Sequence, residues 1–310
     1  MPVDAAVQGL IDAMNQQGLK SFEQMSVEEA RGVVESFTGL QKPPQEVATV
    51  VEAAYRGPAG DQDLKIYIPD AAGPLPVVVY FHGGGFIAGG LSVADEPSRA
   101  VANDAGVIVV AVSYRLAPEH TFPAATDDTF AALEWVAQNI QRYGGDASRM
   151  AVMGDSAGGN LAAVAAIRAR DEDGPRLRAQ VLIYPVIDST AELSSRAEFK
   201  DGYVVTAAGL DWFWEQYLSS PDVAENPLAT PSKAASLADL PPALILTTEY
   251  EVARDEAEAY GQQLADAGVE TEVTRFDGLV HGVYYMSGAV PRSAELHDAV
   301  VKFLAERLAT

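Results

Sequence analysis

One serine stands in a glycine-flanked setting that favours covalent chemistry. The strand-like run MAVMG leads into Gly154-Asp-Ser156-Ala-Gly158, and the apolar helical run GNLAAVAAIRA follows. Strand, G-x-S-x-G and helix in this order predict a sharp turn that exposes the serine hydroxyl at the start of the helix. Glycine is needed at 154 and 158 because side chains there would clash with the neighbouring strand and helix. We therefore predict that Ser156 is a nucleophile.

A serine hydroxyl needs a base, and the chain offers four histidines. His82 opens a glycine loop, His120 lies thirty-six residues before the serine, and His297 falls in an amphipathic helical pattern that suits a solvated face. His281 follows the last strand-like run, on a loop at the carboxyl end of that strand, and comes after the serine in the chain. We predict that His281 is the base.

A carboxylate between Ser156 and His281 must orient the imidazole and stabilise its protonated form. The strand-like run ALILTT ends in Glu249-Tyr-Glu251-Val-Ala-Arg-Asp255, where three acids compete. Glu249 can still belong to the strand, and Asp255 has the position of an acid at a helix N-terminus. Spacing alone slightly favours Glu251 as this carboxylate, and Asp255 is the alternative.

A second glycine-rich loop follows the strand-like run PVVVYF, in His82-Gly83-Gly84-Gly85-Phe86. Consecutive glycines leave backbone N–H groups exposed, and two of them with the N–H of Ala157 could hold the oxyanion of a tetrahedral intermediate. A phosphate site is disfavoured because neither a P-loop nor a G-x-G-x-x-G pattern is completed. A flexible turn is the remaining alternative. We expect His82 to brace this loop by a hydrogen bond.

The elements that must position these groups are short apolar strands alternating with helices. Strand-like runs lie near 49–55, 64–69, 76–81, 107–112, 150–154, 179–185, 243–248 and 271–276. Helix-like stretches lie near 95–104, 125–142, 158–169, 255–267 and 292–308. Such helices are the crossovers that parallel strands require, and nearly continuous apolar strands indicate burial on both faces. The sequence predicts an α/β fold with one core and a mostly parallel, doubly wound sheet.

Two segments fall outside this alternation. The first forty residues have apolar side chains at helical spacing, at Val7, Leu10, Ile11 and Met14, and Ser26 to Glu29 form a capping box. More than fifty residues rich in aromatics separate Pro185 from the strand near Ala243. Such an insertion is usually a lid or a binding element, and it could pack with the N-terminal helices above the carboxyl edge of the sheet. The alternative is that its aromatics form only the insertion's own small core.

Composition excludes several classes of site and partner. The 310 residues include no cysteine, which leaves no thiol nucleophile, disulfide framework or cysteine-type zinc site. The net charge of −23 repels phosphate backbones and anionic membranes, so we expect no nucleic-acid or lipid-headgroup binding. No apolar run reaches about eighteen residues, and MPVDAAVQGL lacks the pattern of a signal peptide. We expect no membrane insertion and a cytoplasmic location.

Taken together, the motifs resemble the hormone-sensitive lipase family of α/β hydrolases, called family IV among bacterial esterases, in its GDSAG branch. Five segments match in order: SVEEAR, HGGGF at 82–86, YRLAPEH at 114–120, GDSAGGN at 154–160, and EYEVARDEAEAY followed by VHG ending at 282. The resemblance covers essentially the whole chain. It implies an eight-stranded core formed by 46–187 and 241–310, under a helical cap formed by 1–45 and the insertion 188–240.

The resemblance also implies roles for individual residues. Ser156 would be the nucleophile and His281 the base, with Gly84, Gly85 and Ala157 as oxyanion donors and Gly83 as a further one. It favours Glu251 as the acid, although the commoner pattern has Asp-Pro where this chain has Glu251-Val252. A minority of GDSAG members is similar in using Glu. Two residues of YRLAPE, Arg115 and Glu119, are interpreted as structural braces.

These observations predict a carboxylic-ester hydrolase that forms an acyl-enzyme and acts on short to medium acyl esters, with no cofactor and no metal. An amidase or peptidase with the same triad is the enzyme alternative. A small-molecule receptor on the same fold, like the plant gibberellin receptors, is disfavoured because such receptors typically lack the histidine found here at 281. A homodimer is a further expectation, because the strand-like run TEVTRF could lie at an exposed sheet edge.

Overall fold

Eight strands form one sheet in the computed structural model, which describes residues 2–309, in the order β1-β2-β4-β3-β5-β6-β7-β8. Their bounds are β1 Thr49–Gly57, β2 Gly60–Ile68, β3 Leu75–Phe81, β4 Ile108–Val112, β5 Gly145–Asp155, β6 Leu177–Ile183, β7 Ala243–Tyr250 and β8 Thr271–Val280. β1 and β2 form an antiparallel hairpin, β2 pairs antiparallel with β4, and the remaining neighbours are parallel. The predicted mostly parallel α/β sheet is confirmed.

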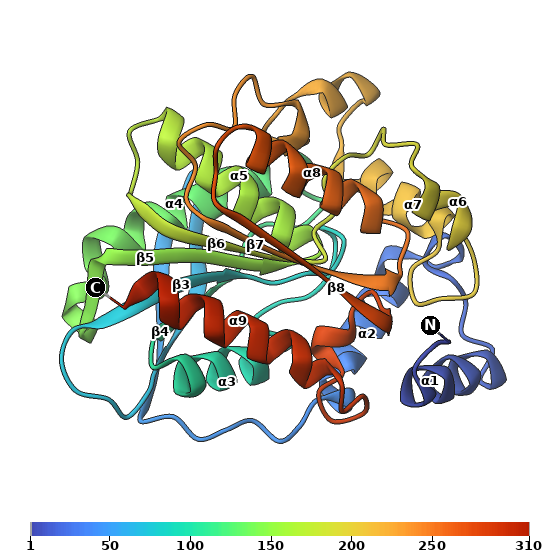
Figure 1. Cartoon of the computed structure of the whole chain (residues 1–310), viewed down its shortest axis with the longest axis horizontal. Coiled ribbons are helices and arrows are strands. Elements are labelled where there is room, and N and C mark those ends of the chain that lie inside the picture. The colour runs from blue at the N-terminus through green and yellow to red at the C-terminus, as the bar shows by residue number, and fades with distance from the viewer. Residues whose placement is uncertain (1, 310) are drawn as a thin grey trace.

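Helices cover both faces of this sheet (Figure 1). α3 Asp95–Ala105 and α9 Ser293–Leu308 lie on one face, and α4 Ala124–Asn139, α5 Ala157–Asp171 and α8 Arg254–Asp266 lie on the other. The core therefore divides into two apolar clusters, one on each side of the strands. Because β3, β4 and β5 are covered on both sides, their strands read as continuous runs of valine and other apolar residues.

Two strands are longer than their apolar patterns predict. β5 begins at Gly145, five residues before the apolar run, because Gly145 already pairs with Leu75 of β3. β8 continues past Phe276 to Val280, and after a register shift Val280 pairs with Tyr250 at the end of β7. The extension brings the chain to the carboxyl edge of the sheet directly before His281.

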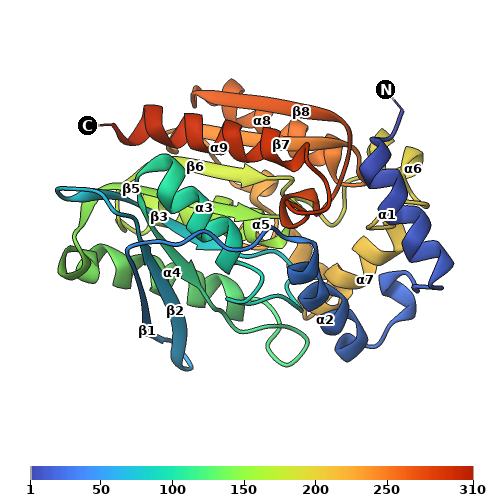
Figure 2. The same cartoon turned by 90° about the horizontal axis from the view of Figure 1, so that it is seen from below.

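The N-terminal helices lie at that carboxyl edge, next to the helices of the insertion (Figure 2). The N-terminal ones are α1 Ala5–Gln16, α2 Val27–Ser36 and the short helices η1 Phe22–Gln24 and η2 Phe37–Leu40. Ser26 and Glu29 form the predicted capping box. The insertion contributes α6 Ser194–Glu198, α7 Ala207–Tyr217, η4 Pro221–Glu225 and η5 Pro231–Lys233. Two further short helices belong to other parts of the chain, η3 Ile140–Tyr143 and η6 Val283–Tyr285.

The aromatics of the insertion do more than form a core of their own. The Phe213 ring of α7 lies 4.9 Å from the Phe22 ring of η1, centroid to centroid. Tyr217 stacks on Phe86 of the glycine loop, with 3.8 Å between ring centroids. A 3.0 Å hydrogen bond from Thr206 to Glu23 adds a polar link to the N-terminal segment. The insertion is therefore packed against both the N-terminal helices and the loop that follows β3.

None of the helices that the structure describes combines the length and the apolar character that a bilayer crossing demands.

Candidate active site

Ser156 lies at a strained turn between β5 and α5. Its backbone angles are φ 54° and ψ −120°, in a region that side-chain-bearing residues rarely occupy. A β-carbon on Gly154 would lie 2.0 Å from the carbonyl oxygen of Gly158, and one on Gly158 would lie 2.0 Å from that of Phe81. Both glycines are therefore required by close backbone approach, as the sequence predicts, and the turn holds the serine at the N-terminus of α5.

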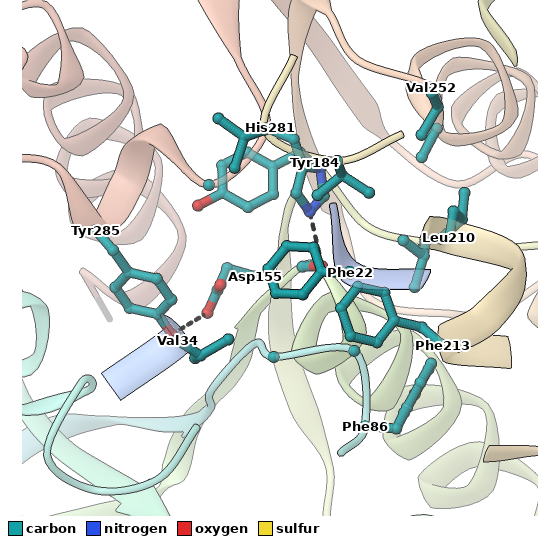
Figure 3. A pocket seen from close by; sticks show the side chains of 18 of the residues that line it. Phe22, Val34, Phe86, Asp155, Tyr184, Leu210, Phe213, Val252, His281 and Tyr285 are labelled. Atoms are coloured by element: carbon teal, nitrogen blue, oxygen red, sulfur yellow. Dashed lines mark hydrogen bonds between the residues drawn. The ribbon is translucent and has the colours of Figure 1, made fainter. Parts of the chain in front are cut away.

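His281 contacts this serine, and Figure 3 shows the labelled imidazole with this hydrogen bond as a dashed line. The imidazole Nε2 lies 2.8 Å from the Ser156 Oγ, within hydrogen-bond distance. The ring is mostly buried and lies against Tyr184, at 4.7 Å between ring centroids. Because His281 follows the last residue of β8, the sheet itself fixes the position of the imidazole relative to the turn after β5.

Glu251 lies on the other side of the imidazole. Its Oε2 is 3.4 Å from His281 Nδ1, and its side chain is fully buried. That separation is longer than an ordinary N–H···O hydrogen bond, and the geometry does not make it one. The same Oε2 accepts a 2.6 Å hydrogen bond from Thr248 Oγ1. Thr248, at the end of β7, thus competes with the imidazole for this carboxylate oxygen.

The two other acids of this segment face different partners. Asp255 accepts hydrogen bonds from Arg254 Nε at 2.8 Å and from the Ser195 N–H at 2.9 Å, which direct it toward the insertion. Glu249 accepts from the Gly278 N–H at 2.7 Å. Of the three candidates, Glu251 is the acid that lies beside the imidazole.

The glycine loop supplies backbone donors next to the serine. Gly84 and Gly85 both have positive φ, and neither N–H has a hydrogen-bond acceptor among residues 2–309. Ala157 is the first residue of α5, where a backbone N–H has no partner within the helix. A β-carbon on Gly85 would lie 2.2 Å from the Phe213 ring, so glycine is required there as well.

The N–H of Gly83, the further oxyanion donor that the resemblance implies, is engaged elsewhere. It donates to Asp155 Oδ1 at 2.9 Å and also lies 3.1 Å from the Tyr285 hydroxyl oxygen. A donor already engaged with a buried carboxylate is not free to bind an oxyanion. Gly83 therefore anchors the loop, and the neighbouring glycines present their N–H groups.

The anchor of this loop, Asp155, was not singled out by sequence reasoning. Its Oδ1 accepts hydrogen bonds from Tyr80 and Tyr285 at 2.7 Å each, in addition to the Gly83 N–H. Burial raises the pKa of Asp155 to about 6, although these three donors favour its charged form. Its position within G-D-S-A-G, a polar residue ending an apolar strand, was the available signal.

The remaining histidines have structural surroundings. His82 Nδ1 lies 2.8 Å from the Gly83 carbonyl oxygen and the ring stacks on Tyr114, so it braces the loop as predicted. Burial lowers the pKa of His82 to about 4, which keeps it neutral. His297 on α9 pairs with Asp104 at 2.8 Å, and His120 is exposed.

Both predicted braces of YRLAPE make ion pairs. Arg115 binds Asp128 through two hydrogen bonds of 2.7 and 2.8 Å. Glu119 binds Arg31 of α2 through two of 2.9 and 2.6 Å. Arg31 also donates to the carbonyl oxygen of Ile87 at 2.8 Å, directly after the glycine loop. The role of Arg31 in joining α2 to that loop was missed, since its partners lie far away in the sequence.

A pocket of about 60 Å³ opens over Ser156. Figure 3 shows its walls, which come from the N-terminal segment, the glycine loop, α7 and the loops after β6 and β7. Apolar side chains dominate them, among them Phe22, Val34, Leu210, Phe213 and Val252. In this pocket the His281 imidazole contacts the serine hydroxyl. Within residues 2–309 no three potential ligands cluster in a way that would hold a metal ion.

Comparisons with known proteins agree with this fold. A family model described as the alpha/beta hydrolase fold matches residues 78–285. Esterase LipI of Mycobacterium tuberculosis is 45% identical over 251 residues, which span 79% of this chain and 78% of the relative. Gibberellin receptor GID1 of Oryza sativa subsp. japonica is 31% identical over 294 residues, 92% and 79% of the two chains. A solved hyperthermophilic esterase from the archaeon Pyrobaculum calidifontis superposes with a TM-score of 0.93, at 37% identity over 99% of each chain.

Proposed function

The chain belongs to the α/β-hydrolase family, in its hormone-sensitive-lipase-like group of esterases, and we propose that this carboxylesterase works through Ser156, His281 and Glu251. The observation that carries this proposal is the 2.8 Å contact between Ser156 Oγ and His281 Nε2 at the turn after β5. A nucleophile and a base in direct contact, with a third group behind the base, are the arrangement that acyl transfer requires.

The proposed reaction has two halves. In the first, His281 Nε2 takes the proton of Ser156 as Oγ attacks the ester carbonyl carbon, and then gives that proton to the departing alkoxide. The alcohol leaves and the acyl group stays on Ser156 Oγ. In the second half, His281 deprotonates a water that attacks the acyl-enzyme, and the proton returns to Ser156 as the carboxylic acid is released.

Charge develops on the carbonyl oxygen in both halves. The N–H groups of Gly84, Gly85 and Ala157, which have no acceptor in the described part of the chain, would stabilise it in an apolar pocket, where such donors act more strongly than in water. Asp155 would hold the donors in place through Gly83, since its carboxylate accepts the Gly83 N–H.

Glu251 is proposed as the acid that orients His281 and stabilises the imidazolium. Two observations support this role. Glu251 lies 3.4 Å from His281 Nδ1, and its carboxylate is completely buried, which strengthens its interaction with a positive charge on the imidazole. When His281 is protonated, Nδ1–H becomes a charge-assisted donor, and we expect the separation to shorten.

Two substitutions separate the acid from its neighbour. Glu251→Gln removes the charge beside His281, so we expect kcat for p-nitrophenyl acetate to fall by about 10³- to 10⁴-fold, as for loss of the acid in other triads. Asp255→Asn is the matched control, because that carboxylate contacts Arg254 and Ser195, and kcat should stay within a few-fold. Near-normal kcat in Glu251→Gln would refute this assignment.

The pocket size supports a preference for small acyl groups. A volume of about 60 Å³ over the serine is far smaller than the roughly 150 Å³ that accepts a benzene ring. The acetyl group of an acetate ester therefore fits over the serine without displacement of side chains. Comparing kcat/KM for p-nitrophenyl acetate, butyrate and decanoate tests this, and comparing p-nitrophenyl acetate with p-nitroacetanilide tests preference for esters over amides.

The rice relative is named a gibberellin receptor. A receptor without turnover is not the function we favour for this chain. The contact between His281 and the serine hydroxyl, and the N–H groups of the glycine loop, support turnover instead. Hydrolysis of p-nitrophenyl acetate by the purified protein discriminates the two functions directly.

The remaining proposals concern organisation. We propose that residues 1–45 and 188–240 form a cap over a core of 46–187 and 241–310, supported by the contacts of Phe22 and Glu23 with α7 and Thr206. A homodimer through β8 is supported by its place at the sheet edge and by Val273, which is 43% exposed. Light scattering after size exclusion would give twice 32.8 kDa for a dimer. We also propose a cytoplasmic location, which cell fractionation would test.

A further inference from the structure

A second apolar cavity, of about 240 Å³, lies beneath α1. We call it the α1 chamber. Its lining comes from α1, α2, η2, the insertion, and the end of β8 with the loop after it, and among residues 2–309 no charged side chain lines it. α1 packs on the core through Val7 and Ile11, whereas Leu10 and Met14 stay half-buried along the chamber. Leu19 at its rim is 41% exposed, one of the few large apolar side chains that face solvent.

The chamber adjoins the catalytic pocket. Phe37 of η2 and Val204 of the insertion line both cavities, so these two apolar side chains are part of the wall between them. This wall stands next to the base. A β-carbon on Gly282, directly after His281, would lie 3.7 Å from Phe37 Cε2 and 3.7 Å from Met286 Cε of the chamber.

We propose that the α1 chamber binds the distal part of an alkyl chain of the ester substrate, with Phe37 and Val204 as the gate between the chamber and Ser156. The proposal rests on the function proposed above and extends it. The catalytic pocket of about 60 Å³ holds the reacting group and the first carbons, and longer chains need further apolar space. The chamber is the adjoining cavity with that chemistry.

Its size and lining suit an alkyl chain of medium length. A cavity of about 150 Å³ with aliphatic walls binds benzene, so 240 Å³ accepts a fragment of about six to eight carbons. Each methylene moved from water to an apolar wall favours binding by about fourfold. Phe37 and Val204 are themselves only half-buried, which leaves their side chains room to move.

Filling the chamber tests the proposal. Ala13 is a half-buried chamber residue on α1, and Ala13→Phe would place a ring inside the cavity. Ala5→Phe is the matched control, since Ala5 is exposed on the same helix and does not line the chamber. The readout is the ratio of kcat/KM for a long-chain ester to that for a short one, so that a general loss of folded protein cancels.

Two substrate pairs distinguish where the chain enters. In the first pair, p-nitrophenyl decanoate is compared with p-nitrophenyl acetate, and the long alkyl chain is on the acyl side. In the second pair, decyl acetate is compared with ethyl acetate, and the long alkyl chain is on the alcohol side. We expect Ala13→Phe to lower at least one long-to-short ratio tenfold or more, while Ala5→Phe leaves both unchanged. Phe37→Ala should raise the same ratio because it removes half of the gate.

The outcomes are distinguishable from failure of the proposed function. If wild type hydrolyses the short esters but neither ratio changes in Ala13→Phe, the chamber does not bind substrate and this inference is overturned, while the esterase assignment stands. The same holds if Ala5→Phe lowers the ratio as much as Ala13→Phe. If wild type hydrolyses none of the esters, the proposed function fails and the chamber proposal falls with it.

Discussion

The burial of Glu256 predicts how the free energy of unfolding depends on pH. This α8 residue lies where the chain leaves the core for the insertion, and its Oε1 accepts hydrogen bonds from the N–H groups of Ile187 at 2.7 Å and Asp188 at 3.4 Å. Burial raises the pKa of Glu256 from 4.5 to about 8, and the nearby Asp188 charge adds to the effect, against Arg196. The carboxyl group is therefore protonated in the folded protein at neutral pH.

The sign of the pH dependence follows from this direction. A group whose pKa is higher in the folded than in the unfolded state stabilises the fold fully below its unfolded pKa, and this contribution is lost as pH rises through the folded pKa. With values of 4.5 and about 8, Glu256 alone lowers the free energy of unfolding by about 4 kcal/mol between pH 5 and pH 9. That is a large part of the roughly 5 to 15 kcal/mol of a typical domain.

Glu256→Gln isolates this contribution. The amide has the same shape, keeps an oxygen to accept from Ile187 and cannot ionise, while all other titrating groups remain. We would measure the free energy of unfolding of wild type and variant in urea from pH 5 to pH 9. We expect the free energy of the variant minus that of the wild type to increase by about 4 kcal/mol across this range. Parallel curves for the two proteins across this range would refute the assignment of a buried, neutral carboxyl group.

Two further substitutions test packing around the site. Gly158→Ala should destabilise the fold by at least about 3 kcal/mol in urea, since its β-carbon would meet the Phe81 carbonyl oxygen at 2.0 Å; a loss under 1 kcal/mol would contradict the close approach. Arg31→Ala should cost about 1 to 2 kcal/mol because it breaks the links to Glu119 and the glycine loop, and Arg56→Ala, in a largely exposed ion pair, should cost little. Equal costs for both arginines would oppose this role of Arg31.

The sheet and the turn after β5 could be predicted from the sequence because their signals are local. Apolar runs and helical spacing give the strands and crossovers, and the flanking glycines give the turn at Ser156. His281 could be selected because it follows a strand. Its exact place was less accessible, since β8 continues to Val280 beyond the apolar pattern and its extension is fixed by pairing with β7.

The parts that the sequence could not supply depend on contacts between distant residues. Gly83, Gly84 and Gly85 look equivalent in the sequence, and only the position of Asp155 engages the first of them. The tyrosines that share this carboxylate come from other elements, Tyr80 from β3 and Tyr285 from η6. No local pattern indicates such partners.

The same reason explains why Glu251 could be favoured but not singled out by spacing. Glu249, Glu251 and Asp255 lie within seven residues, and each is compatible with a strand end or helix start. The fold directs Asp255 toward Arg254 and Ser195 and places Glu251 behind the imidazole of His281. Three-dimensional neighbours, which the sequence does not contain, separate these acids.

The most direct test of the account is to detect the acyl group on Ser156. Wild type and Ser156→Ala would be mixed rapidly with p-nitrophenyl acetate, with p-nitrophenol followed in the first turnover and the quenched protein analysed by peptide mass spectrometry. We predict one acetyl group on Ser156 during turnover of the wild type, and neither acetylation nor turnover in Ser156→Ala. Continued hydrolysis by Ser156→Ala, or acetylation at another residue in place of Ser156, would contradict the account.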